Sequence, residues 1–488
     1  MLASRSEFHN SPWSYPLRSP GIRSIAGNAS NLAAARVFTQ AVRGIYVVVL
    51  ARYLGPEIYG LLAYGQSWYM AFLPLTALGL GSIIIREVGR NRERGSEVVA
   101  TSLGLRTLLA FGGAIACGIA GLFTETNVAT EQLLLVFSIA LVGRGIANWS
   151  EQVFAAYETS RYTLQQELLF RILEVIFGLV ALGLGGGATA IAAVHAFIWW
   201  LQAIRGLYLV HHRLTAIRFK LPWQDLARLF IQGLPLCLSA LFSGWLLQGP
   251  LVLYRHVAGA ETDLGQLALA VQALVLLCTV PWSIGMASLP VLSRAVERED
   301  GKDLWFAEGM LRVGFLLGGM VALAAMAFGP WLVEGVLGDG YALAGQMLGP
   351  ALWLLIPLTA GTSLAQVFVA RGRYFIPFLH ALSGAVVFTL TLPMLASFLG
   401  PIGALWATGA GMGVWASGLI IQLARKSALD LSFAVLRPGI VVLLAAALYK
   451  ILEPLSSSLA LGTGLTAMFG SASIFGLLAP IKRLKKQG

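Results

Sequence analysis

The stretch "ARVFTQAVRGIYVVVLARYLG", from Ala35 to Gly55, is long and apolar enough to cross a membrane, yet it contains three arginines. A helix needs about 20 apolar residues to cross about 30 Å of hydrocarbon. Arg36 and Arg43 are seven residues apart, so a helix places both on one face, about 10 Å apart along its axis. A central arginine costs about 2.5–3.5 kcal/mol on insertion scales, so it usually faces a partner or a water-filled cavity. The stretch therefore predicts a membrane helix with a polar inner face.

The rest of the chain has the same apolar character. Of its 488 residues, 57% are hydrophobic and 12% are charged, and the mean hydropathy is +0.76. An ordinary soluble domain has about 25% charged residues. We therefore predict an all-α polytopic membrane protein with about 14 transmembrane helices. The expected spans are 30–54, 62–85, 100–122, 133–156, 164–184, 188–210, 229–253, 266–291, 312–335, 345–369, 376–399, 403–424, 438–454 and 459–480.

Lysine and arginine predict the orientation of these spans. Most of the 34 Lys and Arg residues fall in every second loop, and such loops are typically cytoplasmic. Both termini are therefore expected in the cytosol, with the protein in the inner cell membrane. The net charge of +11 is then largely a consequence of topology and does not indicate a nucleic-acid partner. The odd number of cysteines, three, argues against a disulfide framework.

Two segments of the chain resemble each other and suggest an internal repeat. Both "LARYLGPEIYGLLAYGQSW" (50–68) and "LYRHVAGAETDLGQLALAVQAL" (253–274) have a basic residue, a Gly-containing turn and an apolar run with a Gln. Six spans per copy would give two parallel-repeat six-helix lobes, followed by two C-terminal helices. The predicted parts are a cytosolic disordered leader (1–29), an N-terminal lobe (30–210), a cytosolic connector (211–228), a C-terminal lobe (229–424), and the last two spans with a basic tail (425–488).

The segment "ARYLGPEIYGLLAYGQSWYMAFLPLTALGLGSIIIREVGRNRE" (51–93) resembles the N-terminal signature of bacterial polysaccharide flippases. "GLPLCLSALFSGW" (233–245), "LPVLSRAVERED" (289–300) and "VLGDGYALAGQMLGPALW" (336–353) agree with this resemblance in order and spacing. It places the chain in the O-antigen type family of the multidrug, oligosaccharidyl-lipid and polysaccharide exporter superfamily. The resemblance implies two lobes that alternate access. It also implies transfer of a polyprenyl-pyrophosphate-linked oligosaccharide from the cytosolic to the outer leaflet of the membrane.

Charged residues within the predicted spans are concentrated in the first half. The arginines there are Arg36, Arg43, Arg106, Arg144, Arg171 and Arg205, and the carboxylates are Glu151, Glu167 and Glu174. This excess of arginine favours an anionic headgroup over a cationic drug. We expect Arg106 and Arg205, near the cytosolic ends of their spans, to extend toward the interface.

The remaining four arginines, Arg36, Arg43, Arg144 and Arg171, are the predicted substrate-binding residues, since guanidinium groups suit paired phosphates. Glu167 and Arg171 are four residues apart and could form a purely structural ion pair. Glu174 and Glu151 are candidates for coupling transport to protons or sodium. A permanent pair between Glu174 and Arg171 accounts for the sequence equally well.

Two other functions fit parts of the sequence. A multidrug and toxin exporter of the same superfamily would share the fold, but it would be expected to have an acidic cavity. An enzyme acting on lipid-linked saccharides would need paired carboxylates or a catalytic histidine beside a large outer loop. The sequence has no P-loop, so ATP hydrolysis is not supported. We expect a transporter without cofactor or metal. Membrane lipid is an expected partner, and contact with polysaccharide assembly proteins is left open.

Overall fold

The computed structural model describes residues 22–90, 95–217, 223–257, 261–298, 301–427, 429–475 and 477. All regular secondary structure in these ranges is helical, which confirms the predicted fold class. The helices are α1 (Ile22–Ala77), α2 (Leu80–Arg90), α3 (Gly95–Thr124), α4 (Val128–Ala156), α5 (Arg161–Gly183), α6 (Ala188–Arg213), α7 (Trp223–Val257), α8 (Glu261–Arg298), α9 (Lys302–Leu337), η1 (Asp339–Tyr341), α10 (Ala342–Trp353), α11 (Leu355–Ala370), α12 (Phe375–Leu399), α13 (Pro401–Lys426), η2 (Ser432–Leu436), α14 (Arg437–Leu452) and α15 (Ser457–Ile474).

Eleven helices in the described ranges are long and apolar enough to cross a membrane. One of them, Phe38–Ala77, contains most of the first and most of the second predicted span, whereas α5 and α15 are not among the eleven. α5 contains Glu167, Arg171 and Glu174, which lower its hydropathy. The helices therefore agree with a polytopic protein of about 14 spans, each predicted span having a helical counterpart.

The ends of the first two spans differ from the prediction. α1 begins at Ile22 rather than at residue 30, so part of the predicted disordered leader is helical, while residues 1–21 lie outside the described residues. α1 kinks at Gly55, whose φ of 72° suits glycine because it has no Cβ. The predicted span 62–85 is broken at Leu78 and Gly79, which both have positive φ. These two residues separate α1 from α2.

One further predicted span, 345–369, is divided into α10 and α11 at Leu354. Pro357 stands three residues later and has no amide hydrogen. It cannot donate to the carbonyl of Trp353, so the regular ladder of hydrogen bonds is interrupted there. α10 and α11 both pack against α9, and Asp339–Ala370 as a whole is one of the eleven candidate membrane spans.

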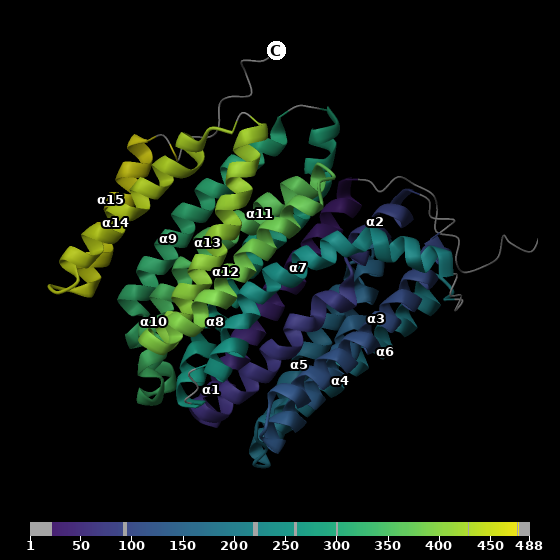
Figure 1. The fold of residues 1–488 in the computed structure, drawn as a ribbon. Helices are drawn as coiled ribbons and strands as arrows, with labels where there is room; N and C mark the ends of the chain where they lie inside the picture. The colour runs from purple at the N-terminus through teal and green to yellow at the C-terminus, as the bar shows by residue number, and fades with distance from the viewer. Residues whose placement is uncertain are drawn as a thin grey trace, which may run out of the picture. The chain divides into compact units, whose positions relative to one another are not determined.

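The chain divides into two compact units. The first contains the described residues up to Val47 together with Phe72–Cys237, and the second contains Val48–Ala71 and the described residues from Leu238 onward. In the first unit, α4 packs against α2, α3, α5 and α6 (Figure 1). Its Trp149 is fully buried, and the indole N–H donates to Ser102 Oγ at 3.0 Å. α4 is therefore the central helix of this unit.

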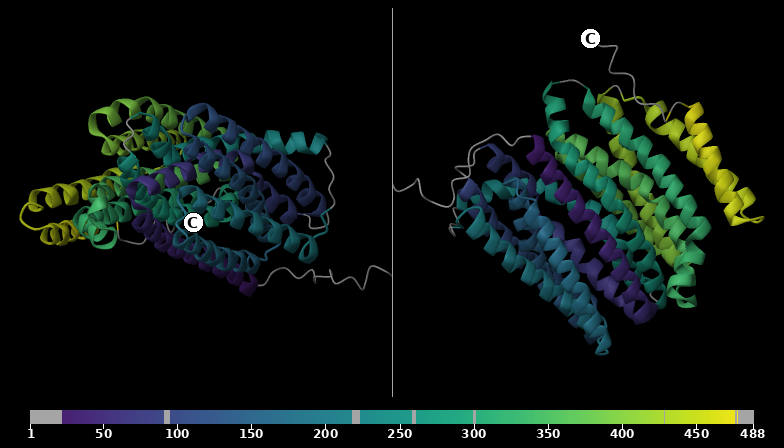
Figure 2. Two further views of the ribbon diagram at one scale, coloured as in Figure 1. Left: turned by 90° about the horizontal axis from the view of Figure 1, so that it is seen from below. Right: turned by 180° about the vertical axis from the view of Figure 1, so that it is seen from behind.

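The second unit is built from the later helices. α12 and α13 form a hairpin, α11 packs on α8, α9 and α13, and the α14–α15 pair packs on α9. Figure 2 shows this pair, in yellow, running alongside α9. Leu323 of α9 is buried against Val442 and Tyr449 of α14 and Met468 of α15. The two C-terminal helices are thus held by an apolar core of their own.

Candidate functional site

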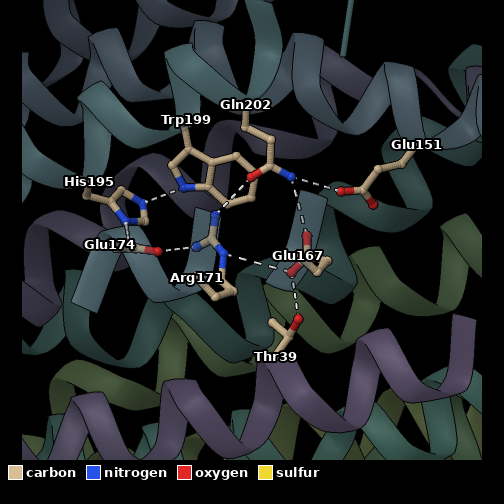
Figure 3. A network of polar contacts seen from close by, with 8 residues as sticks. All are labelled: Thr39, Glu151, Glu167, Arg171, Glu174, His195, Trp199 and Gln202. Carbon is tan, nitrogen blue, oxygen red and sulfur yellow. Dashed lines mark hydrogen bonds and ion pairs between the residues drawn. The ribbon is translucent and has the colours of Figure 1, made fainter. Parts of the chain in front are cut away.

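A network of polar side chains lies inside the first unit, centred on Arg171 of α5 (Figure 3). The Arg171 guanidinium donates through Nη1 to Glu174 Oε2 and through Nη2 to Gln202 Oε1, the latter at 3.0 Å. Its Nε lies 3.8 Å from Glu167 Oε2. The side chains of these three charged residues are about 10% exposed. Burying an ion is costly unless opposite charge and hydrogen bonds compensate it, and Arg171 has both.

Glu174 continues the network to α6. Its Oε1 lies 2.5 Å from Nδ1 of His195, and the indole N–H of Trp199 donates to Nε2 of His195 at 3.0 Å. An indole nitrogen can only donate, so Nε2 must act as an acceptor and hold no proton. The proton of a neutral imidazole is then on Nδ1 and points at the carboxylate. The arrangement therefore assigns one tautomer to His195.

Gln202 links the carboxylates of α4 and α5. Its amide oxygen accepts from Arg171, and its amide nitrogen lies 3.3 Å from Glu151 Oε1 and 3.4 Å from Glu167 Oε1. Thr39 of α1 donates to Glu167 Oε2 at 2.6 Å. Four helices, α1, α4, α5 and α6, thus contribute to one connected set of hydrogen bonds (Figure 3).

Trp199 also brings two guanidinium groups together. Arg144 Cζ lies 4.7 Å from the centroid of the Trp199 ring, and Arg171 Cζ lies 4.5 Å from it. A cation over an aromatic face is stabilised by about 0.5–1 kcal/mol when exposed and by about 2 kcal/mol or more when desolvated. The indole therefore offsets part of the cost of burying two positive charges in one place.

Helical periodicity explains why these residues meet. Glu167, Arg171 and Glu174 are at positions i, i+4 and i+7 of α5, so they lie on one face. The residues of α6 have the same spacing, and the two stripes face each other where α5 packs on α6. The α6 residues are His195, Trp199 and Gln202.

Close packing holds α1 against α5 beside the network. A Cβ built on Gly178 would lie 1.9 Å from the hydroxyl oxygen of Tyr46, so only glycine leaves room for the tyrosine. Tyr46 and Thr39 are seven residues apart on α1 and both contact α5. One face of α1 therefore lies on α5 next to the polar network.

Most of the predicted site residues meet in this network. Arg171 and Glu174 are bonded to each other, Glu151 is reached through Gln202, and Arg144 lies on Trp199. The possible ion pair between Glu167 and Arg171 is present at 3.8 Å, although Glu174 is the closer partner.

The two predicted residues of α1 are placed differently. Arg43 is half-buried on α1, four residues after Thr39. Arg36 lies in α1, but its side chain is outside the part of the chain that the structure describes.

Two arginines expected at the interface also differ from each other. Arg106 is fully buried, so the prediction that it extends to the interface is wrong. Its Nε donates to the carbonyl oxygen of Gly145 at 2.7 Å, which holds the guanidinium between α3 and α4. Arg205 is half-buried, with Cζ 5.9 Å from the centroid of the Phe170 ring.

The sequence analysis missed the residues that connect the predicted ones: Thr39, His195, Trp199 and Gln202. A signal was available in α6, where a His, a Trp and a Gln recur at helical spacing within an apolar run. Among the described residues, no group of three or more His, Cys, Asp or Glu side chains could hold a metal ion.

The fold and this buried network define a class of protein, a polytopic membrane protein with ionisable groups inside a helical unit. Similar folds occur in solved structures. One is the lipid II flippase MurJ in an inward closed conformation, which is 12% identical, with 91% of this chain and 98% of that chain covered and a TM-score of 0.65. Another is a multidrug resistance MATE family transporter in its inward-facing conformation, which is 18% identical, with 80% of this chain and 95% of that chain covered and a TM-score of 0.62. A MOP superfamily transporter from Pyrococcus furiosus is also similar, with 17% identity, 84% of this chain and 96% of that chain covered, and a TM-score of 0.62.

The family described as "Polysaccharide biosynthesis protein" matches residues 25–296, more than half of the chain. The chain belongs to this family, and its fold is the one that flippases and exporters of the MOP superfamily share. A comparison with curated protein sequences found no match.

Proposed function

We propose that this protein translocates a polyprenyl-pyrophosphate-linked oligosaccharide from the cytosolic to the outer leaflet of the cell membrane. Its family and its fold support a flippase or exporter, and transport rather than catalysis. The substrate would be moved by alternating access and driven by an ion gradient or the membrane potential. Assembly of a surface polysaccharide of the O-antigen type would be the process it serves.

The observation that carries this proposal is the pair of guanidinium groups on Trp199, from the half-buried Arg144 and the buried Arg171. A guanidinium can donate two parallel hydrogen bonds to phosphate oxygens, and an aromatic ring beside it holds the cation without neutralising it. Arg43, on the same face of α1 as Thr39, is the third residue that we propose as a phosphate contact. Arg36 belongs to this proposal on sequence grounds alone.

We further propose that Glu174 couples transport to the driving ion. Glu174 is bonded both to Arg171 and to His195. When ionised it competes with an anionic substrate for Arg171, and when protonated it releases that arginine. Glu151, held by Gln202, is the second candidate for coupling. This would let the same network bind the headgroup in one state and release it in the other.

A multidrug exporter is the second candidate, because transporters of the MATE family have the same fold at similar TM-scores. The three carboxylates of the network, Glu151, Glu167 and Glu174, would then contact a cationic drug. The present pairing disfavours this function, since Glu174 and Glu167 are both engaged by Arg171.

A translocation assay with vesicles containing only this protein tests the proposal. A fluorescent lipid-linked oligosaccharide placed in one leaflet should become accessible to an impermeant quencher on the other side. Protein-free vesicles give the background rate. Transport of cationic dyes without movement of the lipid-linked saccharide would support the exporter instead. Conversion of the saccharide into another compound would show an enzyme.

A further inference from the structure

A second cluster of arginines lies in the second unit, where α9, η2, α14 and α15 meet. Arg312 of α9 and Arg437 at the start of α14 both lie near the ring of Phe433, with Cζ 4.6 Å and 5.7 Å from its centroid. Phe433 belongs to η2, a five-residue π-helix. Single π-helical turns are rare and are frequently found at functional sites. The π-helical turn therefore marks this cluster as a candidate functional site.

The two guanidinium groups have only weak partners. Arg312 Nη1 and Arg437 Nη1 each donate over 3.4 Å, to the carbonyl oxygens of Leu477 and Phe475. Arg312 is 6% exposed, and its Nε is buried without a hydrogen-bond partner. Neither arginine forms an ion pair in the part of the chain that the structure describes. Glu308 acts on Arg312 electrostatically but forms no direct ion pair with it, so an anion in contact with the guanidinium would further offset the cost of burying this cation.

The nearby carboxylates are engaged by backbone groups. Glu308, one turn before Arg312 on α9, accepts from the backbone N–H of Asp430 at 3.2 Å. Asp430 in turn accepts from the backbone N–H of Phe433 at 3.1 Å, which fixes the start of η2. These bonds position Phe433 between the two arginines. Among the described contacts, neither Glu308 nor Asp430 forms an ion pair with Arg312 or Arg437.

The open side of the cluster has the character of a lipid site. Arg437 is exposed, and so are three apolar side chains at positions i, i+4 and i+7: Leu436 at the end of η2, and Ile440 and Leu443 of α14. An amphiphile could place its acyl chains along this stripe and its headgroup between the arginines. Arg437 also lies on the side that the loop charges predict to be cytosolic, where basic pockets between helices bind anionic headgroups.

We propose that Arg312, Phe433 and Arg437 form a binding site for the phosphodiester headgroup of an anionic membrane phospholipid. The phosphate would receive hydrogen bonds from both guanidinium groups, which would give up their long bonds to Leu477 and Phe475. Such a lipid would hold α14 and α15 against α9. The site uses no residue of the Arg171 network, so its test does not depend on the proposed transport function.

Binding can be measured on the full chain purified in detergent. Phosphatidylglycerol should raise the midpoint of thermal unfolding with concentration, whereas phosphatidylcholine and inorganic phosphate should not. Arg437→Gln should weaken phosphatidylglycerol binding about tenfold, and Arg312→Gln with Arg437→Gln should remove the response. The matched control, Arg373→Gln with Arg425→Gln, removes two exposed arginines from the same predicted side and should respond like the wild type.

Several results would overturn the assignment. One is wild-type affinity for phosphatidylglycerol in the Arg312→Gln, Arg437→Gln protein. Another is an equal rise of the wild-type unfolding midpoint with phosphatidylcholine, because the site would then not distinguish an anionic headgroup from a zwitterionic one. A response to inorganic phosphate equal to that for phosphatidylglycerol would show a free-anion site rather than a lipid site. Should the double variant fail to fold, Arg437→Gln decides alone, because this side chain is exposed.

Discussion

Nδ1 of His195 on α6 lies 2.5 Å from Oε1 of Glu174 on α5, and the other carboxylate oxygen of Glu174 accepts from Arg171. One carboxylate therefore holds an imidazole and a guanidinium at the same time. Protonating Glu174 would remove its negative charge from both partners. This relationship makes the pair of residues the most informative target for mutation.

Glu174→Gln should uncouple transport from the driving ion while the protein still inserts. The amide keeps the shape of the side chain but cannot become negative, so Arg171 would stay available to phosphate in all states. We expect the translocation rate to lose its dependence on an imposed pH gradient. Glu158→Gln, at an exposed turn, is the control and should keep that dependence. Reduced thermal stability with an unchanged response to the gradient would instead indicate a structural pair.

Arg43→Ala and Arg144→Ala should each abolish translocation of the lipid-linked saccharide without preventing insertion. Both substitutions remove a guanidinium that we place at the phosphates, and Arg144→Ala also removes the cation over Trp199, worth about 0.5–2 kcal/mol of stability. Arg43→Lys should keep partial activity, because lysine keeps the charge but not the planar pair of donors. Normal transport by both alanine variants would rule out their proposed role.

Gly178→Ala should lower the free energy of unfolding by about 1–3 kcal/mol, because the added methyl group would overlap Tyr46. Thermal unfolding in detergent measures the effect. Gly183→Ala on the same helix is the control, since a Cβ there meets nothing within 4 Å. Combining Gly178→Ala with Tyr46→Ala should restore part of the loss, as the overlap would be gone. Additive effects of the two changes would contradict a direct contact.

Reporter fusions test the predicted topology. The distribution of Lys and Arg predicts that Gly488 and Arg94 lie in the cytosol and Val128 on the other side of the membrane. A fusion at Gly488 or after Arg94 should therefore report the cytosol, and one at Val128 the opposite side. Activity of the Gly488 fusion outside the cytosol would overturn the orientation that we assign to the C-terminal helices.

The sequence alone determined the fold class and most of the helices. Hydrocarbon thickness sets how many apolar residues a span needs, so the runs that we marked correspond to helices in the structure. The same periodicity placed Glu167, Arg171 and Glu174 on one face of α5. It also ended the first span at residue 54, beside the kink at Gly55. It did not locate the break at Leu78, because this break depends on local backbone conformation rather than on hydrophobicity.

The tertiary structure alone decided which polar residues meet. Arg171 has a carboxylate four residues before it and another three residues after it, and the sequence could not say which is the closer partner. Packing of α6 on α5 brings His195 and Gln202 of α6 into contact with Glu174 and Arg171 of α5. Burial of Arg106 was likewise set by its neighbours on α4. Helical spacing fixes the face on which a side chain lies, whereas its partners depend on the helix that covers that face.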